Sequence, residues 1–289
     1  MTTKNFVAKI WSARLLANLD NQLSALGLVN RDYEGEISQF GDTVYINQLG
    51  NISIKNYTGA DIDAPEDLTS VQQTLAIDKA QYFNFQVKDI DAAQANVELV
   101  DKAMQRASYQ LADAIDKDIY KAMAEGAGVK IGSASSPIAL DKENIYDQIV
   151  DIAVAMNEKN VPKGNRKLVL PPFAIGMLAK DPRFTKQEAV LASGVVGRVA
   201  GMDIIESNNL KSTNTYVAAV AGVPEATAFA NQVIETEAYR PESNYADAVK
   251  GLSVYGRSVV QKDALAVVYI KVGSASASTP APTSPSTGA

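Results

Sequence analysis

Closely spaced carboxylates are the side chains in this sequence that are best placed to do chemistry. Asp61 and Asp63, followed by Glu66 and Asp67, could gather their oxygens around Ca²⁺, a hard cation that takes roughly six to eight oxygen ligands. The spacing of an EF-hand loop and its closing Glu are both missing. We therefore interpret these residues as an acidic loop exposed to solvent.

A second carboxylate pair, Asp89 and Asp91, would lie on one face of a strand and so suggests an acid–base dyad. The pair stands just before a long helix-forming stretch, a position that favours helix capping and stabilisation of the helix dipole instead. Three acids within that stretch, Asp113, Asp116 and Asp118, are predicted to form a solvated or intersubunit charged surface.

Most other catalytic constellations are excluded because the sequence contains no His and no Cys. This removes Ser-His-Asp triads, cysteine nucleophiles, thiolate or imidazole zinc sites and disulfides. The stretch 126–132 is rich in glycine, but its spacing is wrong for a dinucleotide loop and it follows a predicted helix. No phosphate-binding P-loop pattern is present. We expect no catalytic residue, no cofactor and no metal, and hence no enzyme.

The composition limits the kinds of molecule and surface that this protein can bind. The 289 residues are 46% hydrophobic and 21% charged, as in a soluble globular protein with a substantial core. The formal net charge of −6 argues against tight, non-specific nucleic-acid binding, which relies on Lys and Arg. No apolar run reaches the roughly 18–20 residues that cross a bilayer, and no signal-peptide pattern opens the sequence. We expect synthesis and folding in a cytoplasm, without a membrane.

Hydrophobic spacing in the first part of the chain predicts a helix over 6–26, which Gly27 ends. Trp11, the only Trp, is expected to anchor a packed contact. Over 37–88 the helical spacing gives way to short β-prone runs. We interpret this stretch as a long two-armed β excursion with a mobile tip. Its parts are β-prone runs at 43–49 and 52–57, a polar acidic loop at 60–70, and strand character over 71–87.

The strongest helix prediction covers 92–125. About 30 residues would span ~45 Å, longer than a compact domain usually needs, so the helix is expected to act as a spine. Gly126 and Gly128 end it. Its expected apolar face consists of Val97, Val100, Met104, Ala107, Leu111, Ile115, Ile119 and Ala122, with the charged residues mainly outside it.

The remaining chain predicts a mixed α/β layer and then further strands. Asp141 is a candidate N-cap for a helix over 142–158. Residues 273–289 contain only Gly, Ser, Ala, Thr and Pro and are expected to be a disordered tail. The other predicted elements are a connector at 129–136, strands at 166–170, 202–206, 215–221, 252–255 and 264–272, a short helix at 173–179, a loop at 185–200, and turns at 207–209 and 261–263.

The order of these parts resembles the Hong Kong phage-type capsid fold, an α+β fold shared by tailed-phage major capsid proteins and encapsulins. Individual segments look like coat proteins of phages that infect Gram-positive bacteria. These segments are 40–46 leading into 50–54, then 77–85 with 89–94, and 198–210. No single motif is diagnostic, but the ordered set over about residues 5–272 is.

The resemblance implies a division into the named parts of that family. They are an N-terminal arm at 1–36, an E-loop β excursion at 37–91, the P-domain spine helix and connector at 92–136, the A-domain at 137–228, P-domain strands at 229–272, and the disordered Ser/Thr/Pro tail at 273–289.

The resemblance also implies a function. Such a major capsid protein self-assembles into hexamers and pentamers of an icosahedral head around double-stranded DNA, in the bacterial host cytoplasm, and ends in the virion. A separate scaffolding protein, a portal and decoration proteins are the expected partners. A covalent Lys–Asn crosslink, known in some relatives, lacks identifiable partners for Lys55 or Lys79. The candidate subunit contacts are Trp11, Tyr45, Ile52, Ile54, Tyr57, Phe83, Phe85, Asn208 and Asn209.

Two other functions stay open at this point. An encapsulin-like nanocompartment shell would have the same fold and different cargo, and it would assemble without a scaffold. An enzyme that uses carboxylates on an α/β scaffold is disfavoured by the absence of His, Cys and a phosphate loop.

Overall fold

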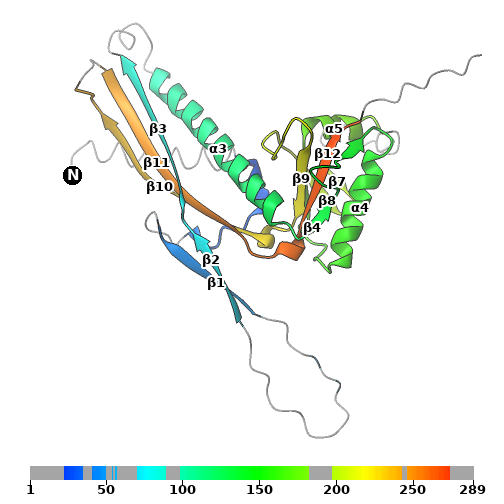
Figure 1. The fold of residues 1–289 in the computed structure, drawn as a ribbon. Coiled ribbons are helices and arrows are strands. Elements are labelled where there is room, and N and C mark those ends of the chain that lie inside the picture. The colour runs from blue at the N-terminus through cyan, green and yellow to red at the C-terminus, as the bar shows by residue number, and fades with distance from the viewer. Residues whose placement is uncertain are drawn as a thin grey trace, which may run out of the picture.

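A computed structural model describes residues 23–34, 41–49, 54, 56, 70–88, 98–181, 197–242 and 246–273. The molecule is elongated (Figure 1). A long helix lies along a narrow sheet at one end, a compact α/β block forms the other end, and a two-stranded ladder projects from the narrow sheet. The short 3-10 helix η1 (Ser24–Leu28) lies against the long helix.

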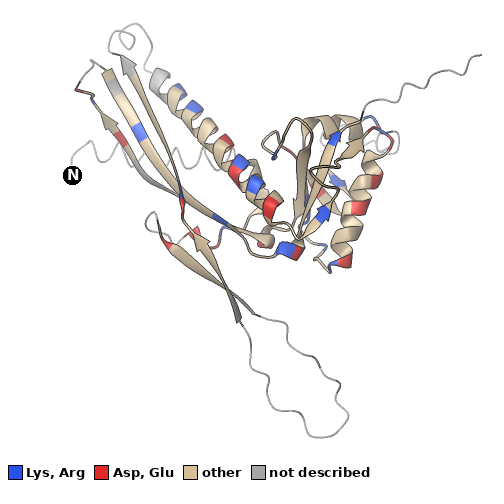
Figure 2. Ribbon diagram, viewed as in Figure 1, with Lys and Arg blue, Asp and Glu red and all other residues tan. Residues whose placement is uncertain are grey.

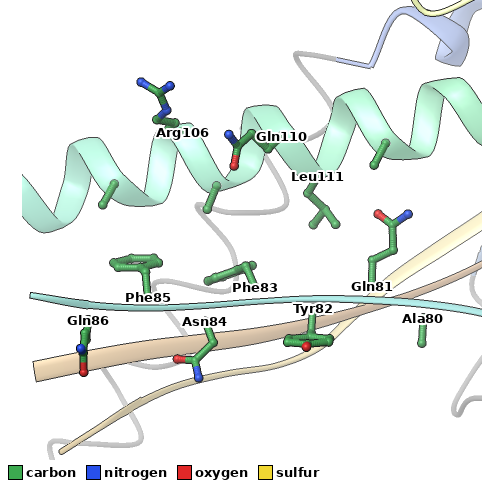
Figure 3. Close-up of a pocket in the computed structure, with 13 residues that line it drawn as sticks. Ala80, Gln81, Tyr82, Phe83, Asn84, Phe85, Gln86, Arg106, Gln110 and Leu111 are labelled. Atoms are coloured by element: carbon green, nitrogen blue, oxygen red, sulfur yellow. The ribbon is translucent and has the colours of Figure 1, made fainter.

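The narrow sheet has three antiparallel strands in the order β10-β11-β3. They are β3 (Lys79–Lys88), β10 (Thr227–Tyr239) and β11 (Ala246–Val259). The long helix α3 (Glu98–Gly126) covers one face of this sheet. Along β3, Gln81, Phe83 and Phe85 point toward α3, whereas the alternate residues point away, as the two-residue period of a strand requires (Figure 3).

The α/β block contains a seven-stranded mixed sheet in the order β4-β12-β9-β6-β8-β7, with β5 beside β4 on the same edge of β12. Helices α4 (Ile145–Glu158) and α5 (Pro172–Leu178) pack on this block. The strands are β4 (Val129–Ile131), β5 (Ile138–Leu140), β6 (Lys167–Leu170), β7 (Arg198–Val199), β8 (Met202–Glu206), β9 (Val217–Gly222) and β12 (Leu265–Val272).

One apolar core runs from the block into the base of α3. It buries Ile115, Ile119 and Met123 of α3 together with Val220 of β9 and Val267 of β12. Because α3 contributes to this core with its second half, the helix joins the block to the narrow sheet. Two short 3-10 helices, η3 (Pro224–Ala226) and η4 (Lys262–Ala264), carry the chain between the two sheets.

The ladder consists of β1 (Thr43–Leu49) and β2 (Ser70–Ala76) in antiparallel register. Thr43 pairs with Ala76 at its base and Leu49 with Ser70 at its far end. Ile77 and Asp78 separate β2 from β3, so the chain runs almost straight from the ladder into the narrow sheet (Figure 1).

The α+β class is confirmed, and so are the long helix, the helix that starts near 142 and the strands near 43–49, 166–170 and 202–206. Asp141 accepts hydrogen bonds from the backbone N–H groups of Glu143 and Asn144, one turn before α4 begins at Ile145. The helix predicted over 6–26 is wrong at its end, because Leu23 is extended and a 3-10 helix follows through Gly27 to Leu28. Residues 6–22 lie outside the described ranges.

Long-range pairing corrects the sequence-based strand predictions at several places. The second arm predicted over 71–87 divides, because β2 pairs with β1 whereas β3 pairs with β11. The expected connector at 129–136 contains β4, and β10 was not predicted at all. The predicted strand 264–272 does form as β12, but in the block sheet and not beside β11. Of 52–57, only Ile54 and Asn56 are described, and neither is in a strand.

Candidate intersubunit surfaces

The side chains predicted to contact neighbouring subunits are spread over the molecule. Trp11, Ile52 and Tyr57 lie outside the described residues. Tyr45 is 60% exposed on the ladder, and Ile54, beyond the ladder's end, is 96% exposed. An apolar side chain in such positions is available to a partner.

The base of the ladder belongs to the subunit's own core. Val44, Ile46, Leu75 and Ile77 are buried on the narrow sheet, where they cluster with Ala228, Ala230, Val254 and Val260. Gln73 Nε2 also donates a hydrogen bond to the Val260 carbonyl at 3.0 Å. Tyr45 alternates with these residues and therefore faces away from the sheet. The ladder thus has an anchored face and an outward face.

An open groove of about 770 Å³ runs between α3 and β3 (Figure 3). Phe83 and Phe85 form its floor, with ring centroids 6.1 Å apart, and Leu111 and several alanines of α3 form its opposite wall. Arg106 is the only charged residue among the described residues that line the groove. Phe83 and Phe85 are therefore part of the narrow sheet and not of the ladder, which corrects their predicted place.

Asn208 and Asn209 have different environments in the turn after β8. Asn208 is exposed, whereas the side chain of Asn209 is hydrogen-bonded to the carboxyl of Asp116 in the same chain. Ser207 is buried, and its hydroxyl accepts a hydrogen bond from the Asn209 backbone N–H at 3.2 Å. Asn208 is therefore the member of this turn that stays available to another subunit.

Asp116 lies at a junction of three chain segments. Its carboxyl is 1% exposed and accepts hydrogen bonds from the Ser24 N–H at 2.9 Å, the Ser24 hydroxyl at 2.7 Å and the Ala25 N–H at 3.1 Å. The Ser24 hydroxyl also lies 3.0 Å from the Tyr120 hydroxyl. Burial raises the pKa of Asp116, and its hydrogen bonds to Ser24, Ala25 and Asn209 partly offset that rise.

This junction was not anticipated, because the acids of the helix were expected on a solvated or intersubunit surface. A signal was present in the sequence. Asp116 stands four residues after Ala112 and three before Ile119, so it falls within the apolar stripe of α3. An acid at such a position indicates a buried partner, although it does not identify Ser24, 92 positions away.

A second polar contact joins α3 to the narrow sheet. Arg257 of β11 donates from Nη2 to Asp118 Oδ1 at 2.7 Å and from Nε to the Asp118 carbonyl at 3.1 Å. Tyr255 donates its hydroxyl hydrogen to Asp118 Oδ2 at 3.3 Å. The planar guanidinium satisfies a carboxylate oxygen and a backbone carbonyl at once, which an ammonium group cannot reproduce.

We expect Arg257→Lys to lower the free energy of unfolding by about 1–2 kcal/mol, because the variant loses the forked hydrogen bonds from a partly buried site. Urea unfolding followed by circular dichroism measures this change. Lys250→Ala on the same strand is the matched control. Its ion pair with Glu237 is half exposed on both sides, so its removal should cost less than about 1 kcal/mol. Equal losses in the two variants would contradict the expectation.

Two kinds of site do not occur within the described ranges. No group of three or more acidic side chains is close enough there to hold a metal ion. None of the helices in that part of the chain is both long and apolar enough to cross a membrane. The acidic residues 61–67 and the pair at 89 and 91 lie outside those ranges.

A family model of phage capsid proteins matches residues 70–270, which include the narrow sheet, the spine helix and all of the block except the last two residues of β12. The chain belongs to the phage capsid protein family. No curated protein matches the sequence.

Solved structures share the fold of this capsid protein over most of its length. A chain of Mycobacterium phage Che8 is 28% identical with a TM-score of 0.69, covering 83% of this chain and 89% of that one. The capsid structure of Cyanophage P-SCSP1u is 15% identical with a TM-score of 0.65, covering 86% and 87%. A virus-like particle from Pyrococcus furiosus is 16% identical with a TM-score of 0.57, covering 91% and 99%.

These comparisons confirm the resemblance to tailed-phage major capsid proteins and the Hong Kong phage-type fold. The capsid protein is a structural protein of the capsid shell, and its place is the virion. The described surfaces are accordingly those of a subunit that contacts other subunits.

Proposed function

We propose that this capsid protein assembles with copies of itself into hexamers and pentamers of an icosahedral head that encloses double-stranded DNA. The family match over residues 70–270 is the observation that carries the proposal. The elongated shape and the projecting ladder support it, because repeated head-to-tail contacts require different surfaces at the two sides of a subunit (Figure 1). No catalytic activity is part of this role.

The predicted partition assigns the A-domain, residues 137–228, which supplies most of the α/β block, to the local symmetry axes. The outward face of the ladder, with Tyr45 and then Ile54, would contact a neighbouring subunit's spine helix or narrow sheet. We propose a separate scaffolding protein, a portal and decoration proteins as further partners, with assembly in the host cytoplasm. The net charge of −6 agrees with a shell that does not bind its DNA tightly.

Electron microscopy and native mass measurement of the expressed protein, alone and with a candidate scaffolding protein, test this proposal. Closed shells built from rings of five and six subunits are the expected result. A stable monomer under every assembly condition would contradict it. The nucleic acid or protein found inside separates a phage head from a nanocompartment shell, the alternative function that would have the same fold.

The two ends of the ladder should differ in hydrogen exchange. In free subunits we expect slow exchange at Val44, Ile46 and Leu75, which are buried on the narrow sheet, and fast exchange near Leu49 and Ser70. Assembly should slow the exchange near Leu49 and Ser70, because an isolated two-stranded ladder is only marginally stable in water. Exchange by mass spectrometry on free and assembled protein measures this. Full protection of both ends in the monomer would remove the intersubunit role of the ladder.

A further inference from the structure

One side of helix α3 is exposed to solvent and rich in positive charge. Its polar side chains recur at three- and four-residue intervals, as residues on one side of a helix do. We call this side the α3 strip, and it consists of Lys102, Gln105, Arg106, Tyr109, Gln110, Asp113, Lys117 and Lys121. Its single acid, Asp113, is paired with Lys117. Glu98 and Asp101 precede the strip in the first turn of α3, where acids complement the helix dipole.

The remaining acids of α3 are held by partners within the subunit. Asp116 is buried at its junction. Asp118 accepts a hydrogen bond from Arg257 at 2.7 Å, and Glu125 accepts one from Lys211 at 3.0 Å. These carboxylates therefore do little to neutralise the cations of the strip, and the solvent side of α3 carries a positive charge in a chain whose net charge is −6.

Helix α4, at the other end of the molecule, has the opposite charge. Its exposed side carries Asp147, Asp151 and Glu158 around Val154, and no basic residue stands in its last turn. Figure 2 shows red segments along α4, whereas blue segments occur along α3. A polyanion is therefore attracted to the α3 strip and repelled by the outer side of α4.

The composition of the strip suits a phosphate backbone better than a protein partner. Protein interfaces have an apolar centre, but Tyr109 is the one large side chain of the strip with apolar surface. A DNA backbone is bound by cations and by neutral donors, and the Tyr109 hydroxyl and the amides of Gln105 and Gln110 are such donors. Described residues line a shallow hollow of about 740 Å³ here, and none of them is a carboxylate. From Lys102 to Lys121 the helix spans about 28 Å, a length over which DNA presents a charge roughly every 1.7 Å.

We infer that the α3 strip is the surface through which the subunit contacts the enclosed double-stranded DNA, and that it binds phosphate groups without reading the base sequence. The inference rests on the proposed function and specifies its contact with DNA. Each subunit contributes only a few charges, so a single contact is weak and is lost as salt concentration rises. The many subunits of a shell act together, which makes the sum of weak contacts effective.

Two variants with the same change in net charge test the location of the contact. The strip variant combines Lys102→Gln, Arg106→Gln and Lys121→Gln. The matched control combines Lys142→Gln, Lys163→Gln and Lys180→Gln, which are exposed in the α/β block. Fluorescence anisotropy with a short labelled DNA duplex of mixed sequence measures the affinity of free subunits over a range of salt concentrations. Circular dichroism checks that both variants are folded.

The strip variant should lose at least about tenfold in affinity at the lowest salt concentration. Its slope of log affinity against log salt should be shallower by roughly 2.7, about 0.9 for each cation removed. The control should keep the slope of the unmodified protein. Equal slopes in the two variants, or no binding by the unmodified protein at the lowest salt concentration, would overturn the inference. Poly-glutamate that displaces the labelled duplex better than unlabelled duplex does would also overturn it, because the strip would then be a surface for an acidic protein.

Electron microscopy of the same proteins separates this inference from the proposed function. The unmodified protein should form closed shells. If it does so while its DNA affinity is no different from that of the strip variant, the inference fails and the proposed function stands. Unmodified protein that forms no shells under any assembly condition would overturn the proposed function, whatever its affinity for DNA.

Discussion

Asp116→Ala should be the most destabilising substitution of a charged residue in α3, lowering the free energy of unfolding by about 3–5 kcal/mol. The carboxyl is buried and accepts hydrogen bonds from the Ser24 N–H, the Ser24 hydroxyl and the Ala25 N–H. Alanine leaves these donors without an acceptor in a site that water does not reach. Since a domain has only about 5–15 kcal/mol of stability, urea unfolding will show a large shift of the midpoint.

Asp113→Ala, three residues earlier, is the matched control. Asp113 is partly exposed and pairs with Lys117 one turn away, so its loss should cost less than about 0.5 kcal/mol. Asp116→Asn keeps the size of the side chain and removes its charge. The amide nitrogen of Asn would then face one of the N–H donors, so one hydrogen bond would be lost. We expect it to lose about 1–3 kcal/mol. A loss in Asp116→Ala no larger than in Asp113→Ala would show that the junction does not stabilise the subunit.

The same carboxyl makes stability depend on pH. Its pKa is raised by burial above the ordinary value of 3.8 in the unfolded chain. Its proton-linked contribution is therefore fully present below that unfolded value and is lost as pH rises through the higher folded value. The stability difference between the native protein and Asp116→Asn should shrink from pH 4 upward. Unfolding curves of both proteins across this range measure the trend, and a widening difference would contradict it.

Gly256→Ala should detach the ladder from the narrow sheet. A Cβ at Gly256 would lie 2.4 Å from the Ala76 carbonyl oxygen and 2.7 Å from Ile77 Cδ1. The obstacle includes backbone, so the ladder must move and its buried contacts through Leu75 and Ile77 are lost. Overpacking of this kind costs about 1–3 kcal/mol and occasionally more. We expect faster hydrogen exchange over 70–77 and failure of shell assembly.

Gly164→Ala is the control for the backbone effect of replacing glycine. A Cβ at that position has no atom within 4 Å, so stability should stay unchanged or rise slightly. Circular dichroism, exchange and electron microscopy on both variants make the comparison. If Gly256→Ala protein assembles normally and keeps slow exchange at Leu75, the anchored base is not required for the shell.

Sequence periodicity predicted the local elements well where one face is clearly apolar. In α4, within the helix predicted over 142–158, Ile145, Ile149, Ile152 and Met156 recur at helical spacing and are buried. Phe83 and Phe85 lie in the predicted strand stretch 71–87 and share one face of β3, because alternation along a strand does not depend on its partner. Their partner was wrong, since β3 pairs with a strand that is more than 150 residues later. Local pattern carries no information about such pairing.

The failures have two physical origins. Strand β10 is interrupted by polar residues such as Asn231, Gln232 and Thr236, so its alternation is weak and its strand character comes from the ladder with β11. Asp116 was assigned to the surface because burial of a carboxyl requires donors that lie far away in sequence. The candidate groove could not be predicted from the sequence either. Its two walls come from separate elements that only the fold brings together.

The pairing of β12 has a consequence for biosynthesis. This strand lies between β9 on one side and β4 with β5 on the other, yet it is the last of the described elements to be translated. Until it emerges from the ribosome, the block has a sheet of β9, β6, β8 and β7 whose edge at β9 is exposed, while β4 and β5 lack the strand with which they pair. Such edges favour association with the wrong chain. The block is therefore completed only when residues 265–272 insert, and a chain interrupted before them is excluded from the pool of competent subunits.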